Sequence, residues 1–208
     1  SLYYNGTTKS PATSILADIN DALYLDGVRL VVSGSGYVTV TGNTKVSRMS
    51  TTGNYVNTFK VMYADGSQAI YARTGLKQYS ISTYTDRNGN TMSYTYDTDS
   101  PVKHLTKITY NGTHATIEFE YDTSRADPVI TYFGGYKSTE TKRLKAIRTK
   151  LDGVIQHYYQ LTYSASRSAS TLNYITCQSM NRTTQSTIFS YGEGQPTSGF
   201  NSSTLHGA

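Results

Sequence analysis

Apolar and polar residues alternate along much of the chain, and short turns separate the alternating stretches. In residues 59–71, apolar side chains occupy every second position on both sides of Asp65-Gly66. The alternating residues are Phe59, Val61 and Tyr63 before the turn and Ala69 and Tyr71 after it. A period of two is typical of a strand with one buried face, and Asp-Gly favours a tight turn. This pattern therefore predicts a β-hairpin.

Three more turns of the same kind lie between alternating stretches. They are Asn88-Gly89 inside residues 86–90, Asn111-Gly112, and Asp152-Gly153. Asn, Asp and Gly tolerate the positive φ angles that tight turns need. The sequence thus predicts three further hairpins, joining residues 79–85 to 92–96, 107–110 to 115–121, and 144–148 to 156–163.

These hairpins predict an all-β fold, built as mostly antiparallel successive hairpins in an open sheet. The alternation also predicts which residues form the core: Val61, Tyr63, Tyr71, Tyr94, Tyr96, Ile117, Phe119, Tyr121, Leu144, Ile147, Leu161 and Tyr163. Since Phe119 is then a buried aromatic, we expect Phe119→Ala to cost about 3–5 kcal/mol.

The strand and turn signals divide the chain into three parts. Residues 1–23 read as an N-terminal lead-in, in which Ala12–Asn20 could form a short helix. Residues 24–191 read as the β domain. Residues 192–208 are rich in Gly, Ser, Thr and Asn with little to bury, which predicts a flexible C-terminal tail. The first residue is not Met, which reads as a trimmed fragment or mature product.

Composition supports this picture and narrows the function. Only 37% of the residues are hydrophobic and 16% charged, with twenty tyrosines and no tryptophan. The net charge of +5 is spread at low density, so we expect no nucleic-acid partner. Cys177, the one cysteine, allows no internal disulfide and is expected to be a small buried hydrophobe. No apolar run is long enough for a membrane helix.

Several segments resemble a known family when they are read in order. Asp86-Arg87-Asn88-Gly89-Asn90 followed by Tyr94-Thr95-Tyr96-Asp97 is similar to the YD repeat of Rhs proteins. Around it, Leu25–Leu30, Tyr63–Gly66, Phe119–Asp122, Thr131–Gly135, Lys142–Ile147 and Tyr159–Ser164 follow an order similar to the SpvB-like region of toxin-complex B components. The resemblance covers roughly residues 25–191 and rests on hairpin motifs.

The resemblance implies an architectural function. In that family, the region contributes strands to a large hollow β-shell around a variable toxic C-terminal segment. By resemblance, this chain is a non-enzymatic piece of shell wall from a secreted or cell-envelope protein. Its partner would be the remainder of its own parent chain or another part of the shell, and it would need no cofactor, metal or catalytic residue.

One enzymatic alternative has a motif behind it. Glu118-Phe119-Glu120 has the Glu-x-Glu form of a class of ADP-ribosyltransferases sometimes fused to SpvB-like regions, and Arg73 and Ser82-Thr83 precede it in a compatible order. Such an enzyme needs both glutamates in an open cleft. Here they alternate with Ile117 and Phe119, which instead predicts the wet face of a strand.

The remaining candidates also favour structural roles. The four histidines, His104, His114, His157 and His206, lack metal-site spacing and read as surface or strand residues. Gly34-Ser35-Gly36 reads as a turn because the following residues are strand-like. The basic run Lys137, Lys142, Arg143, Lys145, Arg148 and Lys150 could meet phosphate, but a solvated strand face is the simpler interpretation. Exposed tyrosines leave open a carbohydrate-binding or adhesion module.

Overall fold

The computed structural model describes residues 2–5, 22–52, 55–75, 78–98, 102–123, 125–133, 136–164, 170–180 and 182–191. These residues form seventeen β-strands and no helix. The predicted all-β fold is therefore confirmed. The possible helix at Ala12–Asn20, the tail at residues 192–208 and His206 lie outside the described residues.

The first eight strands are β1 (Leu2–Asn5), β2 (Ala22–Leu25), β3 (Val28–Ser33), β4 (Gly36–Thr39), β5 (Lys45–Thr52), β6 (Tyr55–Met62), β7 (Gln68–Arg73) and β8 (Gln78–Thr85). The others are β9 (Thr91–Tyr96), β10 (Leu105–Tyr110), β11 (Ala115–Asp122), β12 (Val129–Phe133), β13 (Tyr136–Glu140), β14 (Arg143–Leu151), β15 (Val154–Ser164), β16 (Thr171–Ser179) and β17 (Arg182–Ile188).

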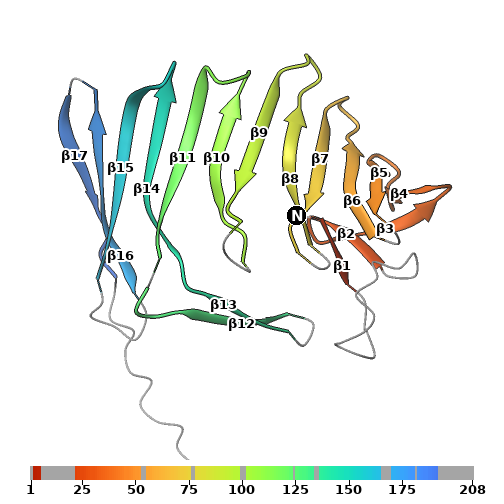
Figure 1. Cartoon of the computed structure of the whole chain (residues 1–208), viewed down its shortest axis with the longest axis horizontal. Helices are drawn as coiled ribbons and strands as arrows, with labels where there is room; N and C mark the ends of the chain where they lie inside the picture. Colours follow the sequence, from red (N-terminus) through yellow and green to blue (C-terminus); the bar gives the residue numbers. More distant parts are fainter. Residues whose placement is uncertain are drawn as a thin grey trace, which may run out of the picture.

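Fifteen of the described strands form one antiparallel sheet in chain order, with β11 next to β14, while β12 and β13 pair only with each other (Figure 1). All four predicted hairpins are present, as β6–β7, β8–β9, β10–β11 and β14–β15. The chain is thus a long meander of neighbouring hairpins.

The turns form as their residue types predict. Asn111 and Asp152 both have φ of +49°, and the glycine after each has φ of +83° and +80°. Asn111-Gly112 begins a four-residue turn between Tyr110 and Ala115, whereas Asp152-Gly153 joins Leu151 directly to Val154 in the two-residue hairpin turn that matches strand twist. Asp26-Gly27 makes the same turn between β2 and β3, a hairpin that the sequence pattern did not predict. Gly34, with φ of +59°, confirms the turn predicted there.

The first eight strands close on themselves. β1 pairs with β2 on one side and with β8 on the other, where Leu2 faces Tyr79 across the strands. The sequence does not predict β1, because four residues with no alternation give no local signal and its partner β8 lies far along the chain. We call β1–β8 the ring, and β9–β11 with β14–β17 the extension.

The core lies inside the ring. Leu2, Phe59 and Val61 have no exposed surface, and Tyr79 is 1% exposed. The Phe59 ring meets the Tyr79 ring edge-on at 4.9 Å between centroids, and the Tyr79 hydroxyl donates to the Val56 carbonyl at 2.8 Å. The β1–β8 ring therefore buries the aromatic side chains of Phe59 and Tyr79, and the buried Tyr79 hydroxyl has a hydrogen-bond acceptor.

The extension buries little, which corrects much of the predicted core. Val61 and Tyr71 are buried as predicted and Tyr63 packs against the core, but the other predicted core residues are only half-buried and Ile117 is 37% exposed. Among the described residues after β8, only His104, Thr116 and Ala146 are buried. The reason is that alternation identifies the apolar face of a strand, but a single sheet layer has nothing packed on that face. Phe119 is half-buried, so the cost expected for Phe119→Ala from full burial is too high. Cys177, which the sequence predicts to be buried, is half-buried as well.

One face of the extension continues the ring interior. Ala69, buried in the ring, stands opposite Tyr84, which stands opposite Met92. Directly opposite residues share a face of the sheet. Further along, two more rows lie on this face: Tyr94, Ile108 and Ile117, and then Phe119, Ile147, Tyr159 and Cys177. We call this side the apolar face and the other side the polar face.

No membrane-spanning helix is present in the part of the chain that the structure describes.

Candidate functional site

The β12–β13 hairpin leaves the sheet between β11 and β14. Because β11 and β14 pair directly with each other, residues 123–142 are an insertion at one end of the sheet. Figure 1 shows this hairpin crossing the end of the sheet toward the N-terminal strands. In the part of the chain that the structure describes, its only ladder is internal, from Val129 opposite Glu140 to Phe133 opposite Tyr136. The polar groups at its base therefore fix its position.

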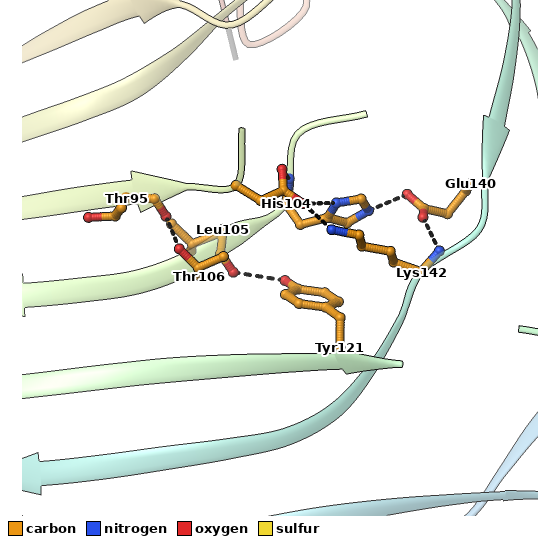
Figure 2. Close-up of polar contacts among 8 residues, drawn as sticks. Thr95, His104, Leu105, Thr106, Tyr121, Glu140 and Lys142 are labelled. Carbon is orange, nitrogen blue, oxygen red and sulfur yellow. Dashed lines mark hydrogen bonds and ion pairs between the residues drawn. The ribbon is translucent and has the colours of Figure 1, made fainter. Parts of the chain in front are cut away.

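A buried histidine stands at this base. His104 lies just before β10, and its side chain is 8% exposed. Its Nδ1 lies 2.8 Å from Asp97 Oδ2. Its Nε2 lies 2.7 Å from Glu140 Oε2 (Figure 2). Asp97 follows β9, whereas Glu140 ends β13. The imidazole therefore bridges the main sheet and the projecting hairpin.

Lys142 completes this group. Its ammonium donates to Asp97 Oδ2 at 2.8 Å, and its backbone N–H donates to Glu140 Oε1 at 2.7 Å. The Tyr121 ring packs 5.0 Å from the imidazole, and its hydroxyl donates to the Leu105 carbonyl at 2.9 Å. We call Asp97, His104, Glu140 and Lys142 the His104 cluster.

Asp97 is the fixed anion of the cluster. Burial alone would raise the pKa of its carboxyl, but hydrogen bonds from the Lys142 ammonium and from the backbone and ring of His104 lower that pKa to about 2. The backbone N–H of His104 donates to Asp97 Oδ1 at 3.0 Å. Each carboxylate oxygen of Asp97 therefore has a donor in the folded chain.

A second polar junction holds the other end of the insertion. Arg125 donates to both carboxylate oxygens of Asp127, at 3.3 and 3.0 Å. Ser170, just before β16, donates to Asp127 Oδ2 from its backbone N–H at 2.6 Å and from its hydroxyl at 2.7 Å. These donors, the Arg125 guanidinium first, hold the pKa of the Asp127 carboxyl far below its usual value. The insertion is thus attached at both ends.

The lowered pKa of Asp97 predicts a loss of stability in acid. The carboxyl titrates at about 2 when folded against an ordinary value of 3.8, so its contribution is complete above about pH 4 and disappears as pH falls toward 2. We expect this contribution to be about 2–2.5 kcal/mol. Urea unfolding of the wild type and of Asp97→Asn, followed by tyrosine fluorescence from pH 5 to pH 2, measures it. If the free energy of unfolding fell with pH in the same way for both proteins, the lowered pKa of Asp97 would not be the cause of the acid sensitivity.

The Glu-x-Glu motif lies in the middle of the polar face. Lys150 Nζ lies 2.7 Å from Glu118 Oε2, and Arg148 forms an ion pair with Glu120. Arg73 is on β7, Ser82 and Thr83 are on β8, and β9 and β10 lie between these strands and β11. The structure therefore does not bring the three parts of the transferase motif together.

The other sequence candidates are scattered. His114 and His157 are exposed, and His114 forms an ion pair with the exposed Asp152. Most of the basic run is neutralised across strands: Lys142 by Asp97, Arg143 by Asp122, Arg148 by Glu120 and Lys150 by Glu118, while Lys137 and Lys145 are exposed. No group of three or more His, Cys, Asp or Glu residues in the described chain could hold a metal ion.

The expectation for His104 is the one that the structure corrects. Its sequence context indicates a surface or strand residue, yet it is buried at the base of a hairpin. Asp97 lies seven residues earlier in the same β9–β10 connection, whereas Glu140 ends β13, so the proximity of Glu140 has no local sequence signal. Asp97 directly follows the strand-like segment Tyr94-Thr95-Tyr96. An acidic residue at the end of a strand can accept hydrogen bonds from a neighbouring connection, and this is the one sign of the cluster in the sequence.

Comparisons with known proteins give likenesses of fold alone. No family model matches the chain, and no curated protein matches it. The N-terminal domain of the effector protein SpvB from Salmonella typhimurium has a similar structure, with a TM-score of 0.66 and 12% identity over 91% of this chain and 86% of that one.

Two larger assemblies contain a similar region. A crystal structure of TcdB2-TccC3-Cdc42 matches with a TM-score of 0.63, and a Photorhabdus luminescens Tc holotoxin pore matches with a TM-score of 0.62. Both are 12% identical over 85% of this chain, which corresponds to 13% of the matched chain. The fold of this chain is therefore similar to that of a small part of each of these matched chains.

Proposed function

We propose that this chain is a non-enzymatic wall segment of a large secreted toxin-complex protein of the Rhs/YD-repeat kind. The observation that carries the proposal is the apolar face. It is buried within the ring but half-exposed across the extension, although the same cross-strand rows run through both. An apolar sheet face of this extent needs a covering layer, and the rest of a shell supplies one.

The free end of the sheet supports the same function. In the described chain, β17 pairs with β16 alone, so its outer backbone N–H and C=O groups face away from the sheet. Such an edge is a site for adding another strand. In a wall, the next hairpin of the parent protein would continue the sheet there. The matched toxin-complex chains are several times longer than this one, which leaves room for such strands.

The absence of an enzymatic role is part of the proposal, and the ion pairs of the Glu-x-Glu motif support it. Both glutamates already have cationic partners, which would have to be displaced for either to engage a ribose or an acceptor. NAD hydrolysis is the test for this part. A turnover by the wild-type chain that disappears in Glu120→Gln would contradict it.

Cysteine labelling tests the wall function. Cys177 is on the apolar face, and its neighbour Gln178, opposite Tyr158, is on the polar face. We expect a bulky maleimide to label Cys177 in the isolated 208-residue chain but not in the intact parent protein, where that face is covered. The matched control is Gln178→Cys in a Cys177→Ser background, which should be labelled in both, with mass spectrometry reporting the site.

Equal labelling of Cys177 in the isolated chain and in the parent protein would overturn the wall function. The carbohydrate-binding alternative stays a prediction. A glycan array with the isolated chain addresses it, and binding that is lost in Tyr132→Ala, whose side chain is 72% exposed on the projecting hairpin, would favour adhesion instead.

A further inference from the structure

The projecting hairpin depends on its two junctions for its position. Its strands have no ladder with the main sheet, and an isolated two-stranded hairpin is marginally stable in water. It also carries exposed apolar side chains, with Val129 at 43%, Ile130 at 49% and Tyr132 at 72% exposure. Whatever weakens a junction therefore changes how firmly the hairpin is held.

The His104 cluster is a junction whose strength depends on one proton. Both ring nitrogens of His104 face carboxylate oxygens, Asp97 Oδ2 at 2.8 Å and Glu140 Oε2 at 2.7 Å. A neutral imidazole has one N–H, so it can donate to only one of the two. The doubly protonated imidazolium donates to both, and hydrogen bonds between charged partners are the strong ones. The observed geometry is therefore that of the imidazolium.

The surrounding charges point to the same conclusion. Among the described residues, the groups that face the imidazole are the Asp97 carboxylate after β9, the Glu140 carboxylate from β13, the Lys142 ammonium and the Tyr121 ring of β11. Within the His104 cluster, a protonated His104 gives two cations and two anions. A neutral His104 leaves the two carboxylates of the cluster with one cation, which is costly at a site where Asp97 is only 9% exposed.

Loss of the proton acts on one contact in particular. Asp97 is only 9% exposed, whereas Glu140 is 28% exposed and can accept from water instead, so the remaining imidazole N–H stays on Asp97. The Nε2 lone pair then faces the Glu140 carboxylate and repels it. Glu140 is the residue that ends β13, so the attachment of the hairpin is the one that weakens.

We propose that the β12–β13 hairpin is a pH-controlled arm, held against the sheet when His104 is protonated and released at its Glu140 end when His104 is neutral. The Asp127–Ser170 junction has no histidine and keeps the other end attached. The arm thus loosens at one end only. This inference does not depend on the proposed function.

Hydrogen exchange of the full 208-residue chain tests the proposal. Histidines ordinarily change charge between about pH 5 and 8, so protection of the backbone amides in residues 129–142 is measured at both ends of this range. After correction for the intrinsic pH dependence of exchange, we expect protection to be roughly tenfold lower at the higher pH, since one charge-assisted hydrogen bond is lost. Amides of β6 and β7 in the ring should show no such change.

Two variants isolate the proton. In Glu140→Gln, the side-chain amide can accept from a protonated imidazole and donate to a neutral one, so protection should become independent of pH and stay high. In His104→Gln, protection should be independent of pH and low. The matched control is His114→Gln, which removes a histidine paired with an aspartate at an exposed position and should retain the wild-type pH dependence.

The same pH dependence in the wild type and in Glu140→Gln would overturn the proposal, and so would equal protection of the wild type at both ends of the range. If His104→Gln does not fold, the Glu140→Gln result decides alone.

Discussion

Phe59→Ala is expected to destabilise the chain by about 3–5 kcal/mol, because it removes a large side chain from the centre of the core. Phe59 has no exposed surface, and its ring lies 4.9 Å from the Tyr79 ring and 6.4 Å from the Tyr37 ring, edge-on to both. The ring of strands is closed around it, so neighbouring side chains cannot collapse fully into the space. Urea unfolding followed by tyrosine fluorescence measures the change in free energy.

Phe119→Ala is the matched control, because it removes the same side chain from a strand of the extension. Phe119 is half-buried on the apolar face, so its truncation removes less contact and leaves no closed cavity. We expect a cost of about 1–2 kcal/mol, in line with partial burial of an apolar side chain. Equal costs for the two variants would show that the core is not concentrated in the ring.

Asp97→Ala is expected to cost about 3–5 kcal/mol, because removal of one partner leaves uncompensated charge at a buried site. The Asp97 side chain is 9% exposed, and its carboxylate accepts from the Lys142 ammonium, the His104 ring and the His104 backbone. Its loss removes the shared acceptor of the Lys142 ammonium, the His104 ring and the His104 backbone N–H at a site with little access to water. Equilibrium unfolding near neutral pH is the measurement.

Asp122→Ala serves as the control for a carboxylate of the same sheet. Asp122 pairs with Arg143 at 3.2 Å, but its side chain is 32% exposed, so solvent screens the pair. The expected cost is about 0–1 kcal/mol. A cost for Asp97→Ala as small as that for Asp122→Ala would mean that the His104 cluster does not stabilise the fold.

Local chemistry explains what could be predicted from the sequence. Hairpins such as β14–β15 are specified by a two-residue turn, Asp152-Gly153, and by the alternation on either side of it, all within a few residues. The ring is different, because its closure joins Leu2 to Tyr79 and no local pattern encodes that pairing. Side chains are buried where the strands close into the β1–β8 ring and half-exposed where the sheet stays a single layer. Alternation is the same in both parts, so on its own it predicts a core in the extension as well.

The candidate site was beyond sequence reasoning for a related reason. Asp97 and His104 stand at the two ends of the β9–β10 connection, and the insertion of residues 123–142 brings Glu140 of β13 to them. Each residue alone has the pattern of a solvated loop. By contrast, the ion pairs of Glu118 and Glu120 follow from alternation on one strand, and that alternation does predict that these glutamates lie on a polar face.

The pairing of β1 with β8, the longest-range strand pairing among the described residues, sets the order in which the chain can fold. Except for β1 with β8 and β11 with β14, every strand of the main sheet pairs with the strand next to it in the sequence. Neighbouring hairpins form quickly, whereas closing a long loop carries an entropic cost that slows folding. We therefore expect ring closure to be the slow step. The edge of β8 is then ready as a template, on which the extension can be added one hairpin at a time.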